Sequence, residues 1–481
     1  MSILRAAALA LLLTSSGAGI EDDAPVIDGA FGEWSDRAEF LDAEGDGGRF
    51  DLLSLSAASH ASRVFVAFSL DREINLQSTD GLELRCFTGP EGKHPHTTGL
   101  VWDFGAKTGY IVSEAGRTQV GQWDIGLLQA PTVSSSRFEV SFLRTTRDGA
   151  PVVPDGTAEF ALVDRGPAGD RLPDVGSCPV GLSDSPEPEP GPVALEKRSP
   201  DHIRILTWNV RFDGLFSRPA PFLRVLRAID PDVICFQEVW SHTARQAADQ
   251  VSLAIPDAVW HGAHTTEGLI VSRFPFLESQ SIDEAGNYWA LVDLPDDAYG
   301  VDLSVVSAHP PCCEQEERRQ EQLDAVAAWL RELKRPGGRD VPCGTPTVVA
   351  GDMNLVGGSE QLATLLQGRI KDEERHGPSF RPDWDETSLR DADPRHAGGR
   401  VNYTWRGPEG PFSPGKLDYV VYSDSVLEQG NAFVLATERL SSDVLERYGL
   451  RASDTVEASD HLPVVVDLIP TGGPPRREAA E

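Results

Sequence analysis

The sequence of 481 residues contains no apolar run long enough to cross a bilayer. An apolar stretch at residues 6–13 is too short for that, but it follows the basic Arg5 and precedes small residues at 14–19. This layout predicts a secretory signal in residues 1–20 and a secreted or periplasmic protein. A buried N-terminal helix is the alternative. No cysteine follows the stretch closely, so a lipid anchor has no support.

Cysteine is scarce, and its spacing contains no C-x-x-C pair and no Cys/His pattern of a structural zinc site. The six cysteines are Cys86, Cys178, Cys235, Cys312, Cys313 and Cys343. Export permits disulfides, although the sequence does not fix their pairing. We expect Cys86 to pair with Cys178, and Cys312 and Cys313 to compete for Cys343. Cys235 lies in an apolar run and is expected to remain a buried thiol.

Basic residues are also in short supply, since 43 Lys and Arg face 75 Asp and Glu, for a net charge of −32 spread over both halves. Such a surface repels polyanions and offers no basic stripe for tight tracking along nucleic acid. A nuclease is still not excluded, because bound divalent cations offset negative charge locally.

The chain is long enough for two domains, and a Pro/Glu-rich segment at residues 181–200 separates them. Residues 21–180 contain short β-branched and aromatic runs between turn residues, which predict an all-β sandwich. Residues 201–470 alternate apolar strands with amphipathic helices, and residues 471–481 form a tail. Strands are expected at 203–210, 233–238, 268–272, 290–294, 301–308, 347–350, 417–422 and 462–468, and helices at 220–229, 243–254, 318–335 and 359–366.

The segment at residues 26–34, Val-Ile-Asp-Gly-Ala-Phe-Gly-Glu-Trp, with the strand-like run at 63–68, resembles family 9-like carbohydrate-binding sandwiches and related sugar- or haem-binding domains. The resemblance implies a glycan ligand for the N-terminal domain. Trp34 is then either a sugar platform or a core aromatic. The acidic stretch at 42–51 either holds calcium or is a solvated loop, and haem binding has no positive support.

Short polar clusters stand at the ends of strand candidates in the C-terminal half. They are Thr207-Trp208-Asn209, Gln237-Glu238, Ala308-His309, Gly351-Asp352-Met353-Asn354, Leu417-Asp418-Tyr419 and Ser459-Asp460-His461. Asp352 and Asn354 could hold a water and a phosphoryl oxygen, or form a backbone turn. Glu238 closes an apolar run, where a carboxylate needs either a cation such as Mg²⁺ or Mn²⁺ or an arginine partner.

The two histidines of these clusters have separate surroundings. A carboxylate such as Asp418 bonded to one nitrogen of His461 would fix its tautomer and raise its basicity. His309 precedes two prolines that end its strand and leave the ring at the rim. A histidine of either kind, taken alone, is more often structural than catalytic.

In order and spacing, these clusters resemble the endonuclease/exonuclease/phosphatase superfamily over about residues 203–469. The resemblance implies an α+β fold, a four-layered αββα sandwich, and a metal-dependent phosphoric ester hydrolase using Mg²⁺, with Mn²⁺ as an alternative. The implied metal ligands are Glu238, Asn209 and Asp460; the phosphate ligands are Asn209, Asn354 and Arg211; the catalytic residues are Asp352, Asn354, His461, His309 and Asp418.

Two positions favour one branch of the superfamily. Arg211 and His309 stand where repair-type apurinic endonucleases usually have an acidic residue and a tyrosine, and they look more like secreted deoxyribonucleases and bacterial sphingomyelinases. Lys416 replaces a frequent arginine. We therefore expect a monomeric phosphodiesterase acting on nucleic acid or phospholipid head groups, with a non-catalytic glycan-binding protein as the alternative. Aromatic residues after Arg211, Phe212 among them, either contact lipid or pack in the core.

Overall fold

The computed structural model describes residues 24–89, 98–153, 156–182, 191–264, 267–335, 337–338, 341–408, 410 and 412–471. The predicted signal at 1–20, residues 183–190 of the predicted linker and all of the predicted tail but Thr471 lie outside the described residues. No helix in the described ranges is both long and apolar enough to span a membrane.

Residues 24–182 form two antiparallel sheets within their described parts. The first has the order β1-β2-β3-β9-β8, and the second has the order β11-β10-β4-β5-β6-β7 with β12 also paired to β10. Their bounds are β1 Glu39–Leu41, β2 Leu52–His60, β3 Arg63–Ile74, β4 Leu82–Thr88, β5 Thr98–Asp103, β6 Thr108–Ser113, β7 Gly116–Gly121, β8 Leu128–Ala130, β9 Ser135–Leu143, β10 Thr157–Asp164, β11 Arg171–Leu172 and β12 Cys178–Gly181, with the 3-10 turns η1 Gly32–Trp34 and η2 Leu76–Ser78. The predicted sandwich is therefore present.

Alternate side chains of strand β3 point to opposite faces of its sheet. Val64, Val66 and Phe68 point into the sandwich core, as expected when alternate residues share a face. Phe65 and Ala67 point the other way and belong to a hydrophobic cluster that continues into the second half of the chain. Both faces of the sheet are thus buried at this strand.

The second half contains a sheet of order β15-β16-β14-β13-β24-β23 and a sheet of order β17-β18-β19-β20-β22-β21. The strands are β13 Ile203–Asn209, β14 Val233–Gln237, β15 His261–His264, β16 Leu269–Ser272, β17 Phe276–Ser281, β18 Tyr288–Val292, β19 Leu303–Ala308, β20 Thr347–Asp352, β21 Arg390–Asp391, β22 Asp418–Tyr422, β23 Leu427–Val434 and β24 Val464–Pro470. The helices are α1 Gly214–Ser217, α2 Pro219–Ile229, α3 Ala244–Ala254, α4 Glu316–Lys334, α5 Ser359–Gln367, α6 Glu373–His376, α7 Ser442–Tyr448 and α8 Asp454–Ala458, with the turn η3 Thr437–Arg439.

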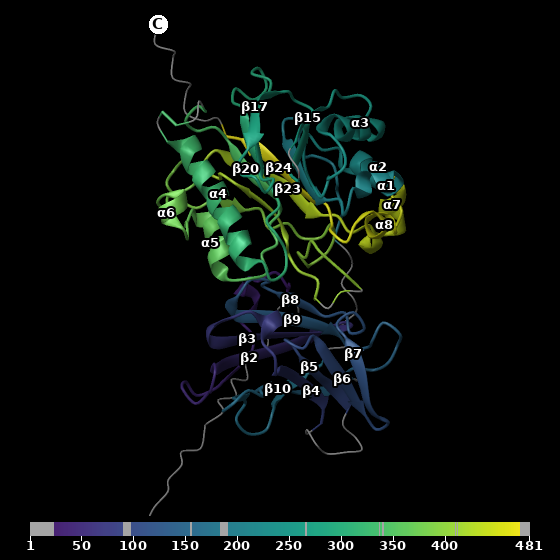
Figure 1. Cartoon of the computed structure of the whole chain (residues 1–481). Coiled ribbons are helices and arrows are strands. Elements are labelled where there is room, and N and C mark those ends of the chain that lie inside the picture. The colour runs from purple at the N-terminus through teal and green to yellow at the C-terminus, as the bar shows by residue number, and fades with distance from the viewer. Residues whose placement is uncertain are drawn as a thin grey trace, which may run out of the picture.

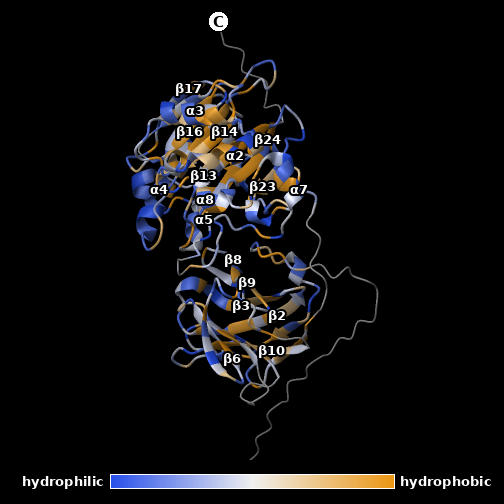
Figure 2. Ribbon diagram, turned by 90° about the vertical axis from the view of Figure 1, so that its right-hand side faces the viewer, coloured by the Kyte–Doolittle hydropathy of each residue, from blue (hydrophilic) through white to orange (hydrophobic). Residues whose placement is uncertain are grey.

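The two sheets pack face to face, and helices cover their outer faces. On β13, Ile205 faces the cluster between the sheets, whereas Leu206 and Trp208 face α2, where Phe222 packs. On the other sheet, Val349 of β20 faces α4 and α5. Figure 2 shows strands that are largely apolar beneath a hydrophilic α4. This arrangement is the four-layered αββα sandwich that the sequence predicts.

The cysteine predictions are wrong in two places. Cys86 and Cys178 are free and buried, because both lie opposite Phe160 on either side of β10. Two strand spacings separate them by about 9.5 Å, beyond the reach of about 7 Å for a disulfide. The structure instead joins the neighbours Cys312 and Cys313, and leaves Cys343 free and exposed. Cys235 is a buried thiol, as expected.

The two halves of the chain are docked onto each other, with β8 and β9 nearest the αββα sandwich (Figure 1). Ser134 N donates to Gly357 O at 2.9 Å, and Asn75 Nδ2 donates to Val356 O at 2.6 Å. Around this contact, Gln122 bonds to the 410–413 loop, Thr132 accepts from Lys416 N, and Ile27 forms a β-bridge with Val401. The β-sandwich therefore touches the segments that follow Asn354 and precede Asp418.

Candidate active site

The polar clusters come together at one edge of the αββα sandwich. Strands β13 and β14 are parallel and end together, with Asn209 opposite Gln237, and the parallel β19 and β20 end together with Ala308 opposite Gly351. Strand β22 begins at this edge, where Asp418 pairs with Asp352 of β20. Residues from both sheets thus meet although they are far apart in the sequence.

Asn209 links the two sheets through one side-chain amide. Its Nδ2 donates to Glu238 Oε1 at 3.0 Å and to Asp352 Oδ2 at 3.0 Å. Its Oδ1 accepts from Arg211 N at 3.0 Å. Asn209 is fully buried, while Glu238 is partly exposed at the rim. The amide therefore holds two carboxylates from different sheets on either side of itself.

His461 lies between two buried carboxylates. Its Nδ1 is 2.9 Å from Asp418 Oδ2, and its Nε2 is 3.5 Å from Asp352 Oδ2. Burial alone lowers the pKa of His461, but the charges of Asp418 and Asp352 outweigh it and raise the pKa to about 10. The imidazolium form is thus held next to Asp352, as expected for a residue that stabilises negative charge.

His309 approaches Asp352 from another strand. Its Nε2 is 3.6 Å from Asp352 Oδ2, and its Nδ1 is 3.0 Å from Glu267 Oε2. Burial lowers the pKa of His309, and the hydrogen bond to Glu267 and the charge of Asp352 outweigh it, so the pKa is raised. The sequence interpretation missed Glu267 and also Asn287, whose Oδ1 accepts from His309 N. Glu267 precedes β16 at the edge where the predicted residues gather, and that position was the available signal.

Asn354 is compatible with both predicted roles of its motif, a backbone turn and a ligand of the phosphoryl oxygen. Its backbone is left-handed (φ 50°), its N donates to Asp352 Oδ1 at 3.2 Å, and its Nδ2 donates to Pro310 O at 2.9 Å. These bonds form a turn that fixes Asp352 and the loop after His309. An amide has a second N–H and a carbonyl oxygen, so Asn354 keeps polar atoms for a ligand.

Oxygen donors for a metal are present, but they divide into two sets. Atoms of Asp352, Asp418 and His461 lie within 4.8 Å of one another. His461 Nδ1 is already bonded to Asp418, so we assign this trio to proton and charge positioning rather than to three metal bonds. Asp418 Oδ1 is buried and has no hydrogen-bond partner within the described part of the chain. Glu238 and Asp352, held by Asn209, give the all-oxygen set that suits Mg²⁺ or Mn²⁺.

Arg211 and Asp460 stand at the rim of the same edge. Arg211 Nε is 3.7 Å from Asp460 Oδ2, and the Arg211 side chain is half exposed. The predicted phosphate ligand Arg211 and the predicted metal ligand Asp460 therefore lie close to each other. Trp405, next to Thr404, forms an isolated bridge with His461, and Thr404 Oγ1 accepts from Asp418 N at 2.9 Å.

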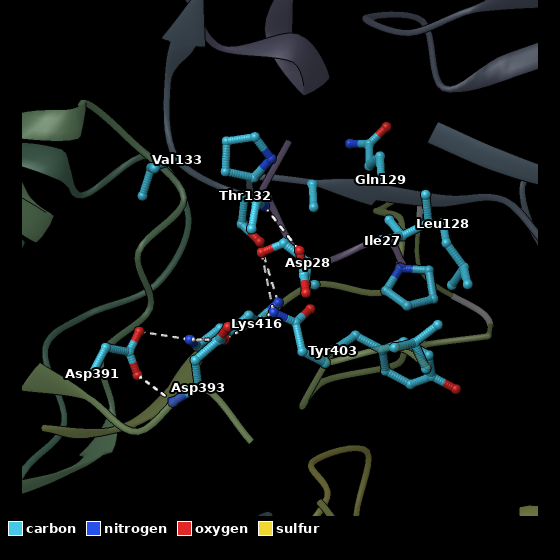
Figure 3. A pocket seen from close by; sticks show the side chains of 18 of the residues that line it. Ile27, Asp28, Leu128, Gln129, Thr132, Val133, Asp391, Asp393, Tyr403 and Lys416 are labelled. Carbon is cyan, nitrogen blue, oxygen red and sulfur yellow. Dashed lines mark hydrogen bonds and ion pairs between the residues drawn. The ribbon is translucent and has the colours of Figure 1, made fainter. Parts of the chain in front are cut away.

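A cavity lies elsewhere, between the β-sandwich and the αββα sandwich. It measures about 310 Å³ and is lined by residues of both, including Asp28, Thr132 and Tyr403 (Figure 3). At its wall the buried Lys416 pairs with Asp391 at 2.6 Å and with Asp393. None of the predicted metal or catalytic residues lines it, so the cavity is separate from the candidate active site.

Comparison with known proteins gives three findings. A search of curated proteins found no match. Solved structures similar to this chain include humanized D. rerio TDP2 with 14 mutations, the human Nocturnin catalytic domain with bound sulfate, and an endonuclease/exonuclease/phosphatase family protein from Bacteroides thetaiotaomicron. Each is 18% identical over 56% of this chain, and the matches cover 99%, 95% and 97% of those chains with TM-scores of 0.35, 0.35 and 0.36. Scores this low carry no argument about activity.

The third finding concerns the sequence family. The profile of the Endonuclease/Exonuclease/phosphatase family matches residues 206–461, the stretch that begins in β13 and ends at His461. The match does not reach the β-sandwich, whose glycan-binding resemblance stays a prediction. Since it covers more than half of the chain and contains every residue of the edge described above, the protein belongs to the endonuclease/exonuclease/phosphatase family.

Proposed function

We propose that this protein is a secreted, divalent-metal-dependent hydrolase of phosphate esters, and specifically a phosphodiesterase acting on nucleic acid or phospholipid head groups. The observation that carries the proposal is the meeting of Glu238, Asp352 and His461 around Asn209 at one edge of two packed sheets. Export rests on the sequence pattern of residues 1–20.

Glu238, Asp352 and Asn209 would hold the metal, with Asp460 at the rim. A bound Mg²⁺ or Mn²⁺ supplies charge neutralisation and Lewis acidity at a phosphoryl oxygen. Asp352 is placed to orient a water, because its carboxylate is fixed by Asn209 and by Asn354 N. Arg211 is half exposed at the rim, where it can reach a phosphate.

His461 and His309 both face Asp352 with one ring nitrogen. The other ring nitrogen contacts a second carboxylate, which is Asp418 for His461 and Glu267 for His309. A pKa of about 10 keeps the His461 ring protonated near neutral pH, and the carboxylate neighbours of His309 raise its pKa as well. Protonated rings at this position stabilise the negative charge that develops on a phosphoryl group under attack. His461 can also give a proton to the leaving oxygen, with Asp418 holding its orientation.

The test is hydrolysis of a phosphodiester panel with Mg²⁺ and with chelator, using plasmid DNA, RNA, sphingomyelin and a chromogenic diester. Glu238→Ala and His461→Ala are each expected to lower kcat by at least about 100-fold, in line with the loss of a catalytic acid or of charge stabilisation. The control Glu428→Ala removes an exposed carboxylate on β23 and should leave the rate unchanged. Metal-dependent activity that survives both active-site substitutions would overturn the proposal.

A further inference from the structure

Two large aromatic side chains are exposed beside Glu238. Phe212 is 62% exposed and Trp240 is 47% exposed, and their ring centroids are 5.2 Å apart at an angle of 52°. Their apolar neighbours Leu215 and Phe222 are fully buried in the core. The segment therefore packs most of its apolar residues and presents only this ring pair to solvent.

The ring pair is tied directly to the candidate active site. Phe212 N donates to Glu238 Oε2 at 2.9 Å, and Asp213 N donates to Glu238 O at 2.9 Å. Asp213 Oδ1 accepts from Trp240 N at 2.9 Å and lies 3.1 Å from His242 Nδ1. Glu238 thus bonds directly to the backbone of Phe212, and Asp213 links the backbone of Trp240 to the same segment.

The backbone next to the ring pair adopts an unfavourable conformation. Arg211, Phe212 and Asp213 have φ values of 48°, 54° and 56°, and Glu238 has 62°. Consecutive non-glycine residues in the left-handed region are strained, and such strain gathers at ligand sites. Burial of Phe212 does not offset the strain, because its ring faces solvent. Binding of a ligand to the ring face would account for the retention of this strain.

We propose that Phe212 and Trp240 form a stacking platform for a nucleobase of the substrate, next to the site that holds its phosphate. The proposal rests on the proposed phosphodiesterase function and names its substrate class as short or single-stranded nucleic acid. Bases stack on aromatic side chains irrespective of sequence. Arg211, adjacent to Phe212, would face the neighbouring phosphate.

The surroundings favour a base over an acyl chain. The carboxylates of Glu238 and Asp213 accept from the backbone N–H groups of Phe212 and Trp240, and Arg211 directly precedes Phe212, so charged groups lie next to both ring residues. Such charges oppose insertion of this segment into the apolar interior of a membrane. A nucleobase suits the pair because it has an apolar face and a polar edge. The net charge of −32 opposes binding of a long duplex, whereas a short strand brings little charge.

The test compares a thymidine dinucleotide with the same diester lacking both bases, with Mg²⁺ and the full chain. Trp240→Ala should lower kcat/KM for the dinucleotide about 10-fold or more, the size expected for loss of one stacked base, and leave the abasic diester unchanged. Trp240→Phe should restore most of the loss. Phe212→Gly should give the same selective loss while it relieves the left-handed strain, so a folding defect cannot explain it.

Leu253→Ala, at another exposed apolar residue, is the matched control and should change neither rate. If wild type cleaves both diesters equally, or Trp240→Ala slows both alike, the platform is refuted while the hydrolase stands. If Trp240→Ala instead lowers only the rate of sphingomyelin hydrolysis in vesicles, the rings contact lipid rather than a nucleobase and the inference fails. If wild type cleaves no diester of any kind with Mg²⁺, the proposed function itself fails.

Discussion

His461 shows how strongly a single residue can be tuned by its contacts. The ring is almost fully buried, and it remains charged because Asp418 and Asp352 lie on its two sides. In the proposed mechanism Asp418 acts on the substrate only through His461, so it is a positioning residue. Its Oδ2 is 2.9 Å from His461 Nδ1, while its Oδ1 has no hydrogen-bond partner among the described residues.

Replacing Asp418 by Asn should lower the pKa of His461 from about 10, because the largest charge that raises it is removed. In the folded wild type this pKa lies above the ordinary value of about 6.5. The stability it contributes is therefore complete below about pH 6.5 and is lost as the pH rises through about 10. In Asp418→Asn that loss of stability at alkaline pH should be smaller.

The measurement is an NMR titration of the His461 ring in chelator, together with thermal unfolding between pH 7 and 10. Asp424→Asn, an exposed carboxylate just past the end of β22, is the control and should leave the titration in place. An unchanged His461 pKa in Asp418→Asn would show that the assigned charge pairing is wrong.

Most predicted site residues could be placed from the sequence because each one stands at the end of an apolar strand, and strand ends meet at a sheet edge. Glu267 could have been found by the same argument, because it directly precedes a predicted strand. Asn287 could not, since its role depends on which loop faces His309 in three dimensions. The sequence also could not predict that the Phe212 side chain is exposed. An aromatic residue among apolar neighbours looks like core until its backbone turns left-handed.

Among the elements of the site, β19 and β20 approach each other closely at Gly351. Gly351 pairs with Ala308, and a Cβ at Gly351 would lie 1.9 Å from Ala308 O. Glycine is therefore required there, because any side chain would push apart the two strands that carry His309 and Asp352. The Gly-Asp-Met-Asn motif begins with glycine for this steric reason.

Gly351→Ala should destabilise the protein by about 1–3 kcal/mol, the usual cost of overpacking, and should lower kcat by displacing His309 from Asp352. Gly181→Ala is the control, since a Cβ at Gly181 meets no atom within 4 Å. Chemical denaturation and steady-state kinetics measure the two effects. Unaltered stability and rate in Gly351→Ala would contradict the contact.

The long apolar strands and the amphipathic helices were predictable from periodicity, and α4 at Glu316–Lys334 lies within two residues of the expected helix at 318–335. Short or irregular elements were not. Strands β15, β17 and β21 and helices α6 to α8 have few apolar residues or few turns, so tertiary contacts rather than local pattern define them.

For the whole molecule, the Pro/Glu-rich segment at 181–200 predicts a linker between two domains and carries no prediction about contacts between them. The structure shows such contacts from Ile27, Asn75, Thr132 and Ser134, among others. The hydrophobic cluster that contains Phe65 also contains Ile205. A spacer's composition describes only the tether, and it gives no information on whether the tethered surfaces are complementary.

A protease site placed at residues 185–190 tests this docking. After cleavage, the two fragments should co-elute in gel filtration and unfold in one thermal transition, because their contacts do not depend on the tether. Ser134→Pro removes the N–H that donates to Gly357 O and should weaken the association. Fragments that separate freely before any substitution would show that the halves are held by the tether alone.

The contact between Ser134 and Gly357 bears on how such a protein can change in evolution. Modules joined only by a tether can be exchanged freely between genes. Here the β-sandwich touches backbone three residues from Asn354 and two residues from Asp418. A foreign module would leave Gly357 O and Lys416 N without these partners, so the two halves are expected to be inherited together and to diverge as a pair.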